Sequence, residues 1–139
     1  SKISPQNIWN EIMWQAILCV SAGAVLGALG RWGLSQWLNP IFSAFNFGTL
    51  FVNFVGCFLI GLLMAFFWQF PQFNGLWKLF LNTGFLGAFT TFSSFSSETI
   101  ELFMSEKWLN GLVVILLHVT GGLFSTALGL LLYGLLVKS

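Results

Sequence analysis

Long uncharged intervals are the feature of this sequence that most limits what it can fold into. After Glu11 the next charged residue is Arg31, the next after that is Lys78, and the acidic residues then gather between Glu98 and Glu106. A helix of about 20 apolar residues crosses the hydrocarbon core of a bilayer, and these intervals are long enough to hold such helices. Charged residues form 6% of the chain, against roughly a quarter in soluble domains. The sequence therefore predicts an all-α membrane protein.

Four transmembrane helices fit the apolar runs, and together they would form a single domain over residues 1–139. In the first run, Gly23 and Gly27 make a small-xxx-small face that permits another helix to approach closely. The same run also has features of a secretory signal peptide, but its glycine spacing continues to Gly30, as a full span would. We expect the four spans at about residues 12–30, 48–68, 76–104 and 112–137.

The third of these stretches is too long for one straight perpendicular helix. At about 1.5 Å per residue it would measure about 43 Å, whereas the hydrocarbon core is about 30 Å thick. Its segment GFLGAFTTFSSF (residues 84–95) contains glycines and a Thr-Thr pair, which are poor helix formers. Irregular backbone at membrane depth is tolerated only within protein or beside a wet cavity. We therefore expect the third helix to be broken near its middle, at a place that does not face lipid.

Positive charges are divided almost evenly between the two sides of the expected bundle. With four spans, Lys2, Lys78 and Lys138 lie on one side, and Arg31 and Lys107 lie on the other. Such a small difference gives little preference for one orientation. A chain that inserts both ways is expected to assemble as an antiparallel dual-topology homodimer with two-fold symmetry.

Aromatic and hydroxyl side chains are interleaved after the expected break. Phe92 and Phe95 share one helix face, and Thr91, Ser94 and Glu98 share a neighbouring face. A phenylalanine stripe is most often ordinary helix packing. The alternative is that the ring edges, which are electropositive, join the hydroxyl donors in lining a route for an anion.

Other polar side chains in or near the spans each have two interpretations. Asn53 either bonds a neighbouring helix or offers its amide hydrogens to a dehydrated anion. Arg31 either extends to the membrane surface or supplies a fixed positive charge or tertiary anchor. His118 is either a hydrogen-bonded structural side chain or a proton carrier. Glu98 and Glu101, near the end of the third stretch, are expected to be exposed to solvent.

Three segments carry a family resemblance: GAVLGALGRW (residues 23–32), GTLFVNFVG (residues 48–56) and the segment at 84–95. In this order and spacing they resemble the signature segments of the Fluc (CrcB-type) family of small bacterial fluoride channels. The likeness covers essentially the whole chain, and the third segment is the most specific of the three.

The resemblance implies an antiparallel dual-topology homodimer with two fluoride pores and a structural Na⁺ ion at the dimer centre. Arg31 and Glu98 match the family's electrostatic and vestibule residues, and the main-chain carbonyls of Gly87 and Thr90 match its Na⁺ ligands. The family's fluoride pathway falls on Asn53, Phe92, Phe95, Thr91, Ser93, Ser94 and Thr126.

The function that follows from the resemblance is a passive, fluoride-selective channel, not an enzyme. It would be a multi-pass protein of the bacterial inner (plasma) membrane that exports cytoplasmic F⁻ and confers fluoride resistance. Expected partners are fluoride, the lipid bilayer and a second copy of the chain; a net charge of +1 offers no surface for nucleic acid. One alternative is a dual-topology exporter of the small multidrug resistance type, although residues 12–30 lack the carboxylate that its coupling needs. The other is a structural membrane subunit.

Overall fold

The computed structural model describes residues 4–40, 47–73 and 75–138, and the regular structure in these residues is helical throughout. Three helices are long and apolar enough to cross a membrane. They are α1 (Pro5–Leu38), α2 (Phe47–Gln69) and α6 (Trp108–Lys138). The all-α membrane fold expected from the sequence is thereby confirmed.

An interrupted helix lies between α2 and α6. After the short η1 (Pro71–Phe73), the chain forms α3 (Leu76–Lys78), a π-helical stretch η2 (Leu79–Leu86), α4 (Gly87–Phe89) and α5 (Phe92–Met104). Thr90 and Thr91 separate α4 from α5 and are extended, with φ/ψ of −85°/155° and −147°/110°. The break expected near the middle of residues 76–104 is confirmed at these two threonines.

The long helices extend beyond the bounds expected from hydropathy. α1 begins seven residues before Ile12 because Ser4 caps it: the Ser4 hydroxyl accepts a hydrogen bond from the Asn7 amide at 3.3 Å, and Pro5 suits the first turn. At its other end α1 continues past Arg31 to Leu38. The charge of Arg31 does not end the helix because its side chain has a partner within the protein, described below.

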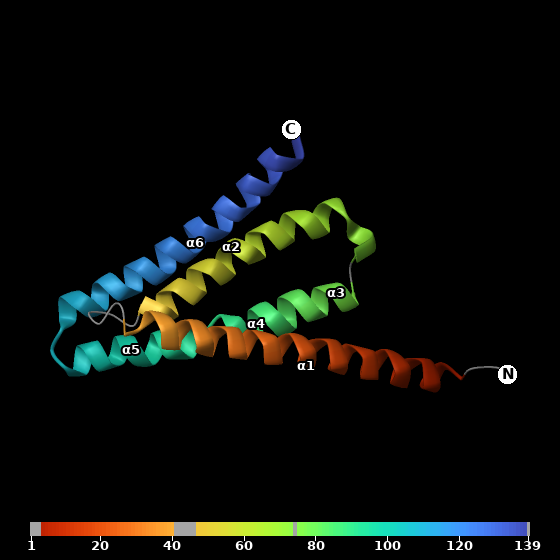
Figure 1. Cartoon of the computed structure of the whole chain (residues 1–139), viewed down its shortest axis with the longest axis horizontal. Helices are drawn as coiled ribbons and strands as arrows, with labels where there is room; N and C mark the ends of the chain where they lie inside the picture. Colours follow the sequence, from red (N-terminus) through yellow and green to blue (C-terminus); the bar gives the residue numbers. More distant parts are fainter. Residues whose placement is uncertain (1–3, 41–46, 74, 139) are drawn as a thin grey trace.

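The helices are arranged in two closely packed pairs. α1 packs against η2 and α4, α2 packs against α6, and α5 completes the bundle against α6. Figure 1 shows that α1 and the interrupted helix run in one direction, while α2 and α6 run in the other. The break of the interrupted helix lies beside the first half of α2, at Asn53 and Gly56.

Glycines allow the helices of both pairs to pack closely. A methyl group built on Gly27 of α1 would overlap the Phe85 carbonyl oxygen, and one on Gly23 would lie 2.8 Å from the Phe85 amide nitrogen. The close approach expected for the glycine face of the first span is therefore confirmed. In the second pair, Gly61 of α2 meets the backbone of α6 and Gly129 of α6 meets the backbone of α2, so each helix is recessed for the other.

Most large apolar side chains point outward, as expected for a protein that is dissolved in lipid. Trp14, for example, is 65% exposed, and many leucines of α6 are exposed to a similar degree, whereas Val52 of α2 is completely buried. Outside a membrane so large an apolar surface would drive aggregation. The chain is a membrane protein.

Candidate functional site

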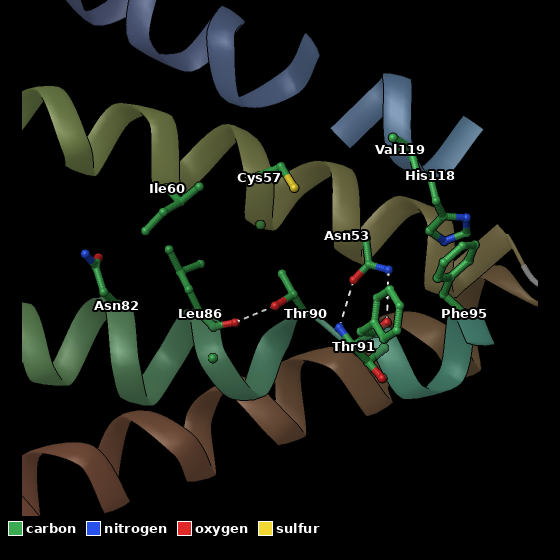
Figure 2. A pocket seen from close by; sticks show the side chains of 13 residues that line it. Asn53, Cys57, Ile60, Asn82, Leu86, Thr90, Thr91, Phe95, His118 and Val119 are labelled. Atoms are coloured by element: carbon green, nitrogen blue, oxygen red, sulfur yellow. Dashed lines mark hydrogen bonds between the residues drawn. The ribbon is translucent and has the colours of Figure 1, made fainter. Parts of the chain in front are cut away.

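An open cavity of about 430 Å³ lies where α2, the interrupted helix and α6 meet. Its walls are mainly apolar and hold a few polar groups near the break (Figure 2). Six of the residues proposed from the sequence line it: Asn53, Gly87, Thr90, Thr91, Phe92 and Phe95. The backbone irregularity and the cavity therefore occur at the same place.

Asn53 of α2 holds the broken backbone through two hydrogen bonds to one residue. The Thr91 amide donates to Asn53 Oδ1 at 2.8 Å, and Asn53 Nδ2 donates to the Thr91 carbonyl oxygen at 3.1 Å (Figure 2). Since the backbone N–H can only donate and the C=O can only accept, this pair of bonds fixes the orientation of the side-chain amide. One Nδ2 hydrogen is used on Thr91, and the second has no acceptor among the described residues.

Three hydroxyl groups form a chain at the start of α5. Thr91 Oγ1 accepts from the Ser94 amide at 3.2 Å and caps the helix. The same oxygen donates to Ser94 Oγ at 3.1 Å and lies 3.3 Å from Ser93 Oγ. When Thr91 donates to Ser94, the Ser94 hydroxyl hydrogen remains available as a donor. Ser93 and Ser94 adjoin the cavity through Thr91 and do not line it directly.

Two phenylalanines and a histidine form an aromatic stack at one end of the cavity. The rings of Phe92 and Phe95 lie 5.4 Å apart in an edge-to-face arrangement, with an interplanar angle of 67°. Phe95 is buried and its ring lies 4.3 Å from that of His118. Phe92 is 77% exposed in the single chain. The Phe95 ring is thus held firmly, whereas the Phe92 ring is packed on one side only.

Thr126 lies apart from the other residues proposed for the pathway. It is on α6, where its hydroxyl donates to the Gly122 carbonyl oxygen at 3.2 Å and its own carbonyl oxygen faces Gly61 of α2. It is not among the residues that line the cavity. Within one chain, the structure does not bring Thr126 together with the Thr91 hydroxyl chain.

Arg31 approaches the break from the side opposite Asn53. Its Nε donates to the carbonyl oxygen of Ala88 at 3.1 Å. In an uninterrupted helix that carbonyl would accept from the amide of Phe92, but the break removes this partner. Of the two interpretations made from the sequence, the geometry favours a tertiary anchor, which contacts the broken helix.

The break also changes the partners of the carbonyl groups that match a Na⁺ site. The amide that would pair with the Gly87 carbonyl in a continuous helix is that of Thr91, which donates to Asn53 instead. Within the described part of the chain, no group of three or more His, Cys, Asp or Glu side chains could hold a metal ion. Hard carbonyl oxygens at Gly87 and Thr90 fit an alkali-metal cation chemically, and one chain supplies only part of a coordination shell.

Glu98 has a partner within the protein, contrary to expectation. Thr49 Oγ1 of α2 donates to Glu98 Oε1 at 2.6 Å, and Glu98 is half-buried. The expected exposure holds for Glu101 but is wrong for Glu98. Charge alone suggested solvent at this end of α5, whereas the adjacent α2 supplies a buried hydroxyl donor that stabilises the carboxylate.

Three residues near the site were missed by the sequence analysis. Thr49 lies one turn before Asn53 and therefore on the same face of α2, and this four-residue spacing is visible in the sequence. Gly56 lies one turn after Asn53 on the same side of α2, and the methyl group of Thr90 fills the space that this glycine leaves. Asn82 lines the cavity, and its Oδ1 is buried without a hydrogen-bond partner in the described structure.

Comparison with known proteins identifies the family. Residues 18–130 match the family model for CrcB-like proteins, described as Camphor Resistance. The "Fluoride-specific ion channel FluC" of Mannheimia succiniciproducens is 55% identical over 121 residues, which is 87% of this chain and 95% of that protein. Proteins with the same name from Haemophilus influenzae (strain PittGG) and Pasteurella multocida (strain Pm70) are 56% and 54% identical over 119 residues, each covering 86% of this chain and 93% of the relative. This chain belongs to the CrcB-like protein family.

Proposed function

We propose that this chain forms a passive fluoride channel. The observation that carries the proposal is the bond pair between Asn53 and Thr91. It holds the broken backbone beside a cavity that Asn53, Phe92 and Phe95 line, and the Thr91 hydroxyl chain adjoins this cavity. The relatives named as fluoride-specific ion channels support the choice of anion.

The physical requirement on such a site is replacement of the hydration shell. Transfer of an isolated ion into a medium of low dielectric constant costs tens of kcal/mol, so no single contact is sufficient. Here the second amide hydrogen of Asn53, the hydroxyl of Ser94 and the edges of Phe92 and Phe95 are the available donors. Because the Asn53 amide and the Phe95 ring are held by other contacts, little ordering is needed when the ion arrives.

The active assembly in this proposal is an antiparallel dual-topology homodimer of four-span chains, with two pores. The near balance of positive charge supports insertion in both orientations. The 77% exposure of Phe92 supports a second chain that covers the open side of the site. Carbonyl oxygens of Gly87 and Thr90 from both chains would hold Na⁺ at the centre, where its charge raises the potential for an anion in either pore.

Fluoride export through the bacterial inner membrane needs no energy source other than the membrane potential. HF crosses bilayers as a neutral acid and ionises in a less acidic cytoplasm, which traps F⁻ there. A negative-inside potential then drives F⁻ outward by about 2.3 kcal/mol per 100 mV. A selective pore is sufficient for resistance to fluoride.

Flux through reconstituted protein tests this function. Liposomes loaded with potassium fluoride and containing the full chain are treated with a potassium ionophore, and external F⁻ is followed with a fluoride electrode. We expect rapid protein-dependent F⁻ efflux, and no comparable Cl⁻ efflux from liposomes loaded with potassium chloride. Equal rates for the two halides, or F⁻ release no faster than from protein-free liposomes, would contradict the proposal.

A further inference from the structure

His118 is a polar group of the cavity that the proposed pathway does not yet use. It lies in α6, lines the cavity, and stacks on Phe95 with an interplanar angle of 32° (Figure 2). Its Nδ1 lies 3.1 Å from the Val114 carbonyl oxygen. Since a carbonyl can only accept, Nδ1 carries the hydrogen of this bond.

This assignment determines what the other ring nitrogen can do. In the neutral ring, Nε2 is then a lone-pair acceptor, and it is buried without a partner in the described structure. A lone pair at this position disfavours an anion. After protonation, the ring carries a positive charge that favours an anion in the adjacent cavity, while Nε2 itself stays buried.

We propose that His118 is a charge-carrying residue beside the fluoride pathway that holds a proton while fluoride occupies the cavity beside Phe95 and Asn53. This inference rests on the proposed function and adds to it a positive charge that changes with pH. The charge acts across the aromatic stack and requires no displacement of the ring. Proton binding at His118 and fluoride binding in the cavity are then reciprocal, because each increases the affinity for the other.

Other ionisable groups near this part of α6 are few among the described residues. From α2, Cys57 lines the same cavity. From α5 come Glu98, which accepts from Thr49, and Glu101, which is exposed. The residues of η2 and α4 include no ionisable side chain. Any effect of Glu98 or Cys57 on flux must therefore be separated from that of His118, which a direct measurement on the imidazole achieves.

The chain contains one histidine, so isotope labelling of histidine reports on His118 alone. Full-length protein with ¹⁵N-labelled histidine is titrated by NMR in sodium fluoride and in sodium chloride of equal ionic strength. We expect the midpoint of the imidazole titration to lie at higher pH in fluoride, by about one unit for a tenfold preference of fluoride for the protonated form. Identical midpoints in the two salts would overturn the proposal, whether or not the protein conducts fluoride.

Flux measurements at about pH 5.5 and 7.5, corrected with protein-free liposomes, supply the second arm. In the wild type we expect F⁻ efflux to be at least threefold faster at the lower pH. His118→Phe keeps a ring against Phe95 but has no proton to exchange, and His118→Gln supplies a permanent amide; both should give equal rates at the two pH values. Thr120→Val, two residues along α6 at an exposed position, should retain the wild-type ratio.

The two arms separate the inference from the function on which it rests. If His118→Phe and His118→Gln keep the wild-type ratio of F⁻ efflux rates at the two pH values, the role of His118 is refuted and the channel function is not. Absence of F⁻ flux in the wild type at both pH values would refute the channel, while the NMR titration would still decide whether His118 senses fluoride.

Discussion

Replacement of Asn53 tests the central contact of the site, because two different substitutions separate its two bonds. Asn53→Ala removes both partners of Thr91, whereas Asn53→Asp keeps an acceptor for the Thr91 amide and loses the donor to the Thr91 carbonyl. An unsatisfied buried polar group costs about 1–3 kcal/mol. Since about 1.4 kcal/mol is a factor of ten, exchange of the Thr91 amide hydrogen should be about 5- to 150-fold faster in Asn53→Ala and nearly unchanged in Asn53→Asp.

Asn53→Asp, which preserves the bond to the Thr91 amide, should nevertheless greatly reduce fluoride occupancy of the cavity. An ionised Asp at about 4 Å from F⁻ repels it by about 4 kcal/mol at an effective dielectric constant of about 20, which is about a thousandfold loss of occupancy. Asn53→Asp should therefore abolish flux while the protein remains dimeric on a sizing column. Amide exchange is measured by NMR and flux with the fluoride electrode. Rapid exchange of the Thr91 amide in Asn53→Asp, or normal flux in that variant, would refute the two-bond argument.

Three other substitutions address separate parts of the structure. Gly61→Ala should destabilise the α2–α6 pair by about 1–3 kcal/mol, because the added methyl group meets backbone; a lower melting temperature than that of Gly134→Ala, where nothing lies within 4 Å, is the check. Phe92→Ile should abolish F⁻ flux while the helical circular dichroism signal stays unchanged, because this ring packs little within its own chain and contributes an edge that isoleucine lacks. Thr49→Val should lower the melting temperature, because the Glu98 carboxylate loses a donor at 2.6 Å; Thr49→Ser should restore it.

The break could be predicted from the sequence because its causes are local. Glycine and paired threonines weaken a helix wherever they occur, and the length of the stretch from residue 76 to 104 requires some departure from a straight helix. The glycine face of α1 could be predicted for the same reason, since its period of four residues is visible in the chain. Such features need no knowledge of which helix lies beside which.

The contacts that hold the break could not be predicted from one helix at a time. Thr49 and Asn53 face α5 only because α2 passes beside the interruption, and Arg31 meets Ala88 only because α1 crosses the same point from the other side. Asn53 was a candidate donor for an anion, but its role as the support of Thr91 depends on an arrangement that no periodicity encodes. Thr126 was placed in the pathway by resemblance, and within one chain it lies against Gly61 instead.

Gly87 connects the break to the second chain of the proposed dimer. A methyl group built there would meet only the Asn82 carbonyl oxygen, at 3.6 Å, so packing within the chain does not require glycine. Glycine in a helix also costs about 1 kcal/mol relative to alanine. Gly87 is nevertheless the first residue of α4, the last turn before the break, where it is exposed and lies beside carbonyl groups that have lost their helical partners. In the proposed dimer, close approach of a second copy, with Na⁺ between the two chains, would account for a small residue at this point.

Gly87→Ala separates the folding of the chain from its assembly. The substitution should leave the helical circular dichroism signal unchanged, and it should weaken dimerisation at least tenfold, because in the proposed dimer the methyl group would stand where the partner backbone approaches. Gly134→Ala makes the same change in α6 at a position with open space and should leave dimerisation unaffected. Dimerisation is measured by analytical ultracentrifugation in detergent with Na⁺ present. If Gly87→Ala dimerises with undiminished affinity, the broken segment is not where the two chains meet. Another surface would then have to bury Phe92 and the carbonyl groups at the break.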